Sequence, residues 1–268
     1  MPELDKKVLT LPKQKVLIPS KGWFYDEKNP LSKGSIELYI PTARHEDILM
    51  SPTLIKKEQV LNEFLKEIIV DPKVDINTML LGDKSYLTIV GRILLYGSEY
   101  KTVISCPACN KESENEFNLE EIKFKELDFD NIPRNKNEFE FTSKFMPDLK
   151  IRFKLLNHAD EQQISRDLKR AKSDFGLDKE ITIRLASLIT KITTKDDVGK
   201  IVELTTPYEK QNYIEMILPA RISREFREYV QKFTPAPDMS VDFSCKECGH
   251  EGKIAIPFDI IDFFYRQG

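Results

Sequence analysis

The alternation of apolar and polar residues over 35–40, SIELYI, predicts a short strand near the start of the chain. Thr42 follows this strand and is a residue type that caps helices, so a helix is expected to begin just after it. A second helix is predicted over 52–70, where leucine, isoleucine and phenylalanine recur on one helical face. A third is predicted from a cap at Asp83 to Gly97, because glycine is favoured just past a helix end.

The second half of the chain shows the same order of patterns. The segment 148–156, DLKIRFKLL, alternates as a strand does, and Asn157 can cap the helical pattern that follows it. Three further helical patterns come later in the chain. The predicted helices of this half cover 158–172, 181–192, 207–218 and 222–233.

The two halves can be aligned at their strand-to-helix junctions. When Thr42 is placed opposite Asn157, Glu46 falls opposite Glu161, and each half then runs on to one pair of cysteines. We interpret this order as an ancient duplication of a unit made of a strand, helices and a cysteine knuckle. The alternative is a chance similarity between two short junctions.

All four cysteines of the chain lie in two C-x-x-C pairs, CPAC and CKEC, each between two strand-like runs. Each pair is therefore expected at the tip of a hairpin. The residues that follow the pairs, Asn110 and Gly249, adopt left-handed backbone readily, as a metal knuckle requires. Zinc takes four ligands, so the two knuckles are expected to share one zinc ion, bound by Cys106, Cys109, Cys245 and Cys248.

Two other interpretations of the cysteines remain open. A redox pair would need one C-x-x-C at the start of a helix, and unrelated pairs of buried thiols would need no hairpins. His250 could replace a cysteine as a ligand, but four thiolates already complete the tetrahedron, so we interpret it as a surface residue of its knuckle. A closed ligand set leaves no position for water, and the zinc is expected to hold structure rather than to catalyse a reaction.

The predicted fold class is α+β. A duplicated unit of a strand and helices occupies 35–130 and again 131–268, and the shared four-cysteine zinc ribbon joins the two halves. Residues 1–34 are rich in proline and are expected to form an extended arm. The arm and the segment 258–265 concentrate aromatic residues, which either pack on the core or dock on a partner. The docking hypothesis places partner contacts at Trp23, Phe24, Tyr25, Phe263 and Phe264.

Composition narrows the classes of function. The 268 residues include 41 Lys and Arg against 44 Asp and Glu, a net charge of −3, and charges of both signs are interspersed. Nowhere does an apolar run approach the roughly 18 residues of a membrane span, so no membrane association is expected and the protein is interpreted as intracellular where it is made. With three histidines and no H-E-x-x-H, G-x-x-x-x-G-K or G-x-G-x-x-G, the chain is not expected to be an enzyme.

A nucleic-acid-binding zinc ribbon is the alternative function. The charges near the knuckles argue against it: residues 110–130 contain eight acidic residues and three lysines, and 235–262 contain six acidic residues and two lysines. Phosphate would be repelled by both surroundings.

The order of motifs resembles the baseplate hub proteins of T-even-type contractile-tailed bacteriophages. The similar segments are IPSKGWFY at 18–25 and LLGDKSYLTIVGRILLYGSEY at 80–100, which leads into CPAC. The resemblance implies a structural or assembly protein of the central baseplate hub, whose partners are other hub proteins and which acts by protein contact. It also implies a location in the host cytoplasm during assembly, and leaves open whether the protein stays in the virion tail.

Overall fold

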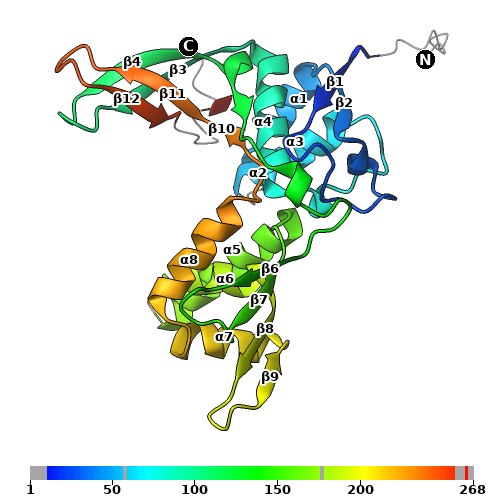
Figure 1. The fold of residues 1–268 in the computed structure, drawn as a ribbon. Coiled ribbons are helices and arrows are strands. Elements are labelled where there is room, and N and C mark those ends of the chain that lie inside the picture. The colour runs from blue at the N-terminus through cyan, green and yellow to red at the C-terminus, as the bar shows by residue number, and fades with distance from the viewer. Residues whose placement is uncertain (1–10, 57–58, 176–177, 257–262, 265–268) are drawn as a thin grey trace.

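A computed structural model describes residues 11–56, 59–175, 178–256 and 263–264. The chain forms two lobes that meet at an angle (Figure 1). We define the first lobe as the described residues of 11–132 together with those of 235–264, and the second lobe as the described residues of 137–234. The chain therefore enters the second lobe once and returns once.

The first lobe combines helices with short antiparallel strands. A two-stranded antiparallel sheet opens it, in which Val16 pairs with Ile36, and helices follow around a buried apolar core. The strands are β1 (Lys13–Leu17) and β2 (Ser35–Tyr39), and the helices are α1 (Ala43–Leu49), α2 (Pro52–Lys56), α3 (Val60–Ile68) and α4 (Leu81–Tyr96). Two 3-10 helices lie between these elements, at Pro30–Lys33 and Ile76–Thr78.

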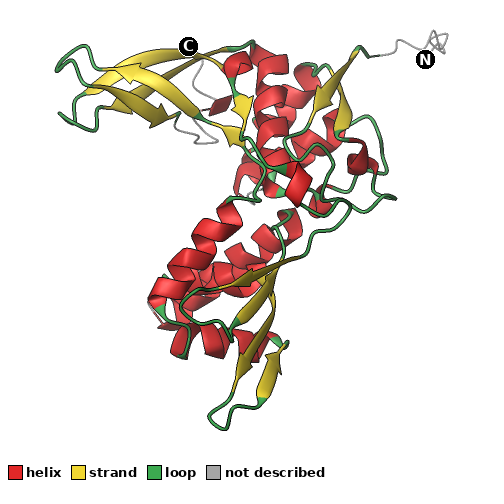
Figure 2. Ribbon diagram, in the orientation of Figure 1, coloured by secondary structure: helices red, strands yellow, loops and turns green. Residues whose placement is uncertain are grey.

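Two long antiparallel hairpins extend from the first lobe and make up most of its strand content (Figure 2). We call them together the ribbon: β3 (Glu99–Ser105) with β4 (Glu112–Asn118), and β11 (Ser240–Ser244) with β12 (Glu251–Ala255). At its base the short β5 (Lys123–Phe124) pairs with β10 (Pro237–Asp238), between 3-10 helices at Leu119–Glu121 and Phe129–Asn131.

The second lobe packs helices on an antiparallel sheet of four strands in the order β6-β7-β8-β9. Its aromatic core joins the sheet to the last helix, where the Phe153 and Phe226 rings lie 5.3 Å apart edge to face. The strands are β6 (Phe139–Thr142), β7 (Lys150–Phe153), β8 (Ile189–Lys195) and β9 (Ile201–Leu204). The helices are α5 (His158–Phe175), α6 (Glu180–Leu188), α7 (Pro207–Met216) and α8 (Ala220–Gln231).

The lobes touch where α4 begins. The backbone N–H of Leu81 donates to the carbonyl of Leu156 (3.2 Å), and the N–H of His158 donates to the carbonyl of Met79 (2.9 Å). Gly82 lies so close to the returning chain that an added Cβ would be 1.7 Å from the carbonyl oxygen of Pro235. Only glycine fits there, so Gly82 permits the close approach between α4 and the segment that leads to β10.

The structure confirms an α+β fold and several predicted elements, and it corrects the arm. Residues 11–34 are not an extended arm, because β1 pairs with β2 and the side chains of Ile18 and Leu31 are buried in the first-lobe core. The last strands of the predicted second unit, β10 to β12, lie with the first lobe, so the two lobes do not follow the predicted boundaries of 35–130 and 131–268.

Several predicted helices differ in their limits. The helical pattern over 52–70 forms two helices, α2 and α3, and that over 181–192 ends at Leu188, after which the chain continues directly into β8. The helix predicted to begin at a cap at Asp83 begins three residues earlier, with Leu80 as its N-cap.

The duplication stays a prediction. Asn157 caps α5 as predicted: its Oδ1 accepts from the N–H of Asp160 (3.0 Å), and its own N–H donates to that carboxylate (3.1 Å). The aligned strands have different surroundings, however, since β2 belongs to a two-stranded sheet and β7 lies inside a four-stranded one.

Candidate metal centre

The four cysteines lie at the tips of the two ribbon hairpins, where their Sγ atoms are all within 4.8 Å of one another. Across the hairpins, Cys106 Sγ lies 3.7 Å from Cys248 Sγ, and Cys109 Sγ lies 3.8 Å from Cys245 Sγ. The prediction that both pairs occupy hairpin tips and come together across the chain is confirmed.

The local sequence explains why the two tips have the same shape. Asn110 has a φ of 56° and Gly249 a φ of 70°, the left-handed backbone that their residue types favour. Because of this turn, the N–H of Asn110 donates to the carbonyl of Cys106 and the N–H of Gly249 donates to that of Cys245, both at 2.9 Å. The matching bonds orient each pair of sulfur atoms toward the other hairpin.

The geometry of the sulfur atoms fits a tetrahedral ion. Zinc–sulfur bonds of about 2.3 Å place the sulfur atoms of a tetrahedron about 3.8 Å apart, which agrees with the two distances between the hairpins. Backbone N–H groups of Cys248 and Glu247 lower the pKa of the Cys245 thiol, whereas burial and the neighbouring thiols raise the pKa of Cys248. A bound cation would favour the thiolate at all four positions. The cluster can therefore hold a soft divalent ion with four thiolates.

Contacts around the cluster join the hairpins without the metal. Ile104 and Phe243 form a small apolar cluster with the buried Cys106 and Cys245 beneath the tips. On the surface, Lys111 Nζ of one knuckle lies 2.6 Å from Glu247 Oε2 of the other. His250 is not part of the four-sulfur cluster, so its interpretation as a surface residue of the knuckle is retained.

The aromatic residues of the predicted arm are packed inside the chain. Phe24 and Tyr25 are 3% and 4% exposed, and Trp23 is half-buried, with its Nε1 donating to the carbonyl of Ile132 (2.9 Å). The ring of Phe24 lies 5.9 Å from that of Phe139. The hypothesis that these side chains form a partner-binding surface is therefore corrected for Phe24 and Tyr25, because the core of the chain already covers them.

Phe263 and Phe264 are also buried. Their rings lie against Tyr100 (5.0 Å) and Phe64 (5.9 Å) respectively, on the first-lobe helices and the base of the ribbon. The alternative that this end of the chain packs on the core is the one observed for these two residues. Residues 258–262 and 265, which the docking hypothesis also included, lie outside the described residues.

A buried polar network under α4 was missed by the sequence analysis. The Asp83 carboxylate accepts from the backbone N–H of Ser20 (2.8 Å) and from the hydroxyl of Tyr25 (2.6 Å), and that hydroxyl accepts from the N–H of Leu80 (2.9 Å). Burial raises the pKa of Asp83 to about 6, although the hydrogen bonds from Ser20 and Tyr25 favour its charged form. Both partners come from segments about 60 residues away, which local patterns cannot reveal.

A second set of hydrogen-bonded polar side chains lies where the two lobes meet. Lys84 Nζ donates to Asn62 Oδ1 (2.6 Å) and lies 2.9 Å from His158 Nδ1, across the lobe boundary. Burial lowers the pKa of Lys84 to about 8, and burial together with the neighbouring Lys84 charge lowers that of His158 to about 4. The imidazole is therefore neutral near pH 7 and can accept a hydrogen bond from the ammonium group.

The raised pKa of Asp83 predicts a pH-dependent difference between the protein and its Asp83→Asn variant. The folded protein holds the proton up to about pH 6, whereas an exposed carboxyl releases it near 3.8, so the contribution of Asp83 to stability is greatest below 3.8 and is lost as the pH rises through 6. We expect the stability of the protein relative to Asp83→Asn to fall by about 2 kcal/mol from pH 4 to pH 7.

Urea unfolding of both proteins at several pH values measures this difference directly. His158 acts in the opposite direction, since its lowered pKa makes stability fall as the pH drops from 6.5 toward 4, but its effect is common to both proteins and cancels. The control is Asp26→Asn, the same substitution at an exposed carboxylate. A constant difference between the protein and Asp83→Asn would contradict the raised pKa.

The fold and the cluster together define a class of protein: an α+β chain whose two distant hairpins are held against each other at a four-cysteine centre. A sequence model of the family described as T4 bacteriophage base plate protein matches residues 25–265, which is most of the chain. The protein therefore belongs to the T4 bacteriophage base plate protein family. Searches of curated proteins and of solved structures found no match to the chain. In the described residues, no helix has the length and apolar character needed to cross a membrane.

Proposed function

We propose that this protein takes part in assembling the central hub of the phage baseplate, through contacts with other hub proteins. The observation that carries the proposal is the family match over residues 25–265. The protein would act in the host cytoplasm while tails are built. We propose no catalytic role, since four thiolates leave a bound metal no open position for water or substrate.

We also propose that the four cysteines bind one structural zinc ion. The close sulfur atoms and the paired knuckle turns support this. Two hairpins tied at their tips form a stiff projection from the first lobe (Figure 1). A rigid projection loses less conformational entropy on binding than two separate hairpins would, so zinc would strengthen contacts made through the ribbon.

The proposal is tested in infected cells. We expect the tagged protein to co-purify with hub proteins identified by mass spectrometry, and a phage that carries Cys248→Ser to yield at least tenfold fewer complete tails in electron micrographs. Cys248 is suited to this test because it is the exposed member of the cluster, so its replacement disturbs the core least. The matched control is His250→Ala, in the same knuckle but outside the cluster, which should assemble tails normally.

Two results would contradict the proposal. The first is normal tail production by the Cys248→Ser phage together with absence of hub proteins from the purification. The second is retention of the purified protein on DNA at moderate salt without any phage protein bound, which would favour the nucleic-acid-binding alternative.

A further inference from the structure

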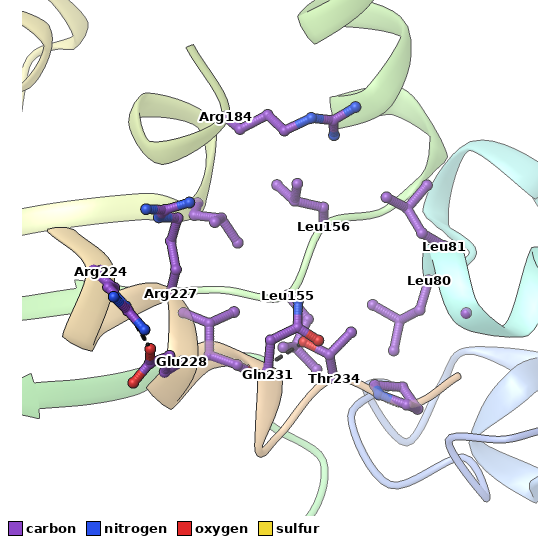
Figure 3. Close-up of a pocket in the computed structure, with 14 residues that line it drawn as sticks. Leu80, Leu81, Leu155, Leu156, Arg184, Arg224, Arg227, Glu228, Gln231 and Thr234 are labelled. Carbon is purple, nitrogen blue, oxygen red and sulfur yellow. Dashed lines mark hydrogen bonds and ion pairs between the residues drawn. The ribbon is translucent and has the colours of Figure 1, made fainter. Parts of the chain in front are cut away.

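A pocket of about 550 Å³ lies at the junction of the two lobes (Figure 3). Its size is in the range of sites that hold small ligands or a few side chains of a peptide. The first lobe contributes the start of α4 and the second contributes α6, α8 and the loop after β7. Its apolar lining consists of Leu80, Leu81, Leu155, Leu156, Leu188 and Val230.

The charged residues around this apolar lining are mostly positive. Three arginines line the pocket, and Glu228 is the only acidic residue among its described lining residues. The Arg224 guanidinium is paired with Glu228 at 2.9 Å, as the dashed line in Figure 3 shows. Arg184 is held by Glu161 at 2.9 Å and by Glu180 at 3.1 Å.

Arg227 differs from the other two arginines. Its Nε donates to the carbonyl of Ser223 at 3.4 Å, and no carboxylate of the described residues pairs with its guanidinium. The side chain is exposed, so its remaining N–H groups are available to a ligand. An occupant with an apolar body and one carboxylate therefore complements both the leucine lining and the free cation.

We propose that this pocket binds a short apolar segment, bearing an acidic side chain, of another baseplate protein. Its apolar side chains would lie on the leucines of both lobes, and its carboxylate would pair with Arg227. Such a segment contacts both lobes at once, so its binding also fixes the angle between them. The assignment of the segment to another baseplate protein rests on the function proposed above. Its apolar and acidic character rests only on the residues that line the pocket.

Peptide binding to the purified full-length protein tests the pocket. The probes are fluorescein-labelled GLLELLG and GLLKLLG peptides with blocked C-termini, which differ only in the central residue, acidic in one and basic in the other. Binding is followed by fluorescence anisotropy. We expect the glutamate peptide to bind about fivefold more tightly than the lysine peptide, as one exposed ion pair of about 1 kcal/mol would give. Arg227→Glu should reverse this preference, and Leu156→Glu should weaken the binding of both peptides.

The matched control is Arg221→Glu, the same charge change on the same helix outside the pocket, where the Arg221 guanidinium packs on Phe145. It should leave the preference for the glutamate peptide unchanged. Thermal unfolding of each variant shows whether it remains folded. Equal binding of the two peptides, absence of binding by either, or a preference that Arg227→Glu does not alter would overturn the proposal.

Two further measurements separate this inference from the proposed function. A dimer in analytical ultracentrifugation that Arg227→Glu dissociates would make a second copy of the chain the occupant and would overturn the inference. Co-purification of hub proteins without selective peptide binding would overturn only the pocket, and selective peptide binding without hub proteins would support the pocket while contradicting the hub function.

Discussion

Replacing Cys106 with serine is expected to abolish zinc binding and to loosen the association of the two hairpins of the ribbon at their tips. The sulfur atoms of all four cysteines converge within 4.8 Å, so the loss of one thiolate breaks a shared site rather than one of two separate sites. Structural zinc contributes roughly 10–16 kcal/mol to small finger peptides, and even a part of this is large against ordinary domain stability. The unmodified protein should carry one zinc per chain and the variant close to none.

The rest of the fold should survive this substitution. The first-lobe core contains many buried residues of α3 and α4, whereas the apolar cluster under the tips contains only a few side chains. Metal analysis by mass spectrometry and amide hydrogen exchange measure the two effects. We expect faster exchange in β3, β4, β11 and β12, with unchanged protection in α4.

The control for the metal experiment is His250→Ala, which should retain its zinc because the imidazole is not part of the four-sulfur cluster. Iron instead of zinc in the purified protein would contradict the proposed metal, because four thiolates also suit iron. Full zinc content in Cys106→Ser would contradict the ligand set.

The cysteine centre could be predicted because it depends on short stretches of sequence and on the coordination chemistry of a metal. The knuckle turns depend on Asn110 and Gly249, whose left-handed backbone is a property of each residue and its immediate neighbours. The approach of two segments more than 130 residues apart followed from the number of ligands that a tetrahedral metal requires. No knowledge of the intervening fold was needed.

The N-terminal arm could not be predicted correctly, because the burial of Phe24 and Tyr25 depends on distant segments. Phe24 packs against Phe139 of the β6 strand, and the sequence around it gives no sign of that contact. Proline content and aromatic residues near a chain end are equally compatible with a free arm and with a packed one. Tertiary contacts decided between the two.

The limit of α6 shows a second cause of error. The run ITKITTK at Ile189–Lys195 continues the apolar spacing of the helix before it, yet it consists of β-branched residues and lysines. Pairing with β7, in which Ile151 lies opposite Ile192, places this run inside the four-stranded sheet. The spacing of apolar residues favoured a helix here, but the β-branched residues favour a strand. Pairing with the neighbouring strands therefore determined the structure of this run.

Asp83 was predicted to cap a helix because of its residue type, but contacts with distant segments of the chain make it a buried hydrogen-bond acceptor. We expect Asp83→Ala to lower the free energy of unfolding by about 3 kcal/mol at pH 7, since it leaves the N–H of Ser20 and the hydroxyl of Tyr25 without their acceptor in a buried place. Tyr25→Phe should cost about 1–3 kcal/mol, because the N–H of Leu80 loses its acceptor and the carboxylate loses a donor.

A double-mutant cycle measured by urea unfolding tests whether these residues act as one network. The double variant Asp83→Ala with Tyr25→Phe should be more stable than the sum of the single effects predicts, by about 1 kcal/mol or more, because both substitutions remove the same hydrogen bond. Lys84→Ala, the adjacent residue on α4 whose ammonium group binds Asn62 instead, serves as the comparison and should add to Tyr25→Phe without coupling. Strict additivity of Asp83→Ala and Tyr25→Phe would mean that the short contact between Tyr25 and Asp83 contributes little, and that the stability of this junction comes from the apolar core beneath α4 instead.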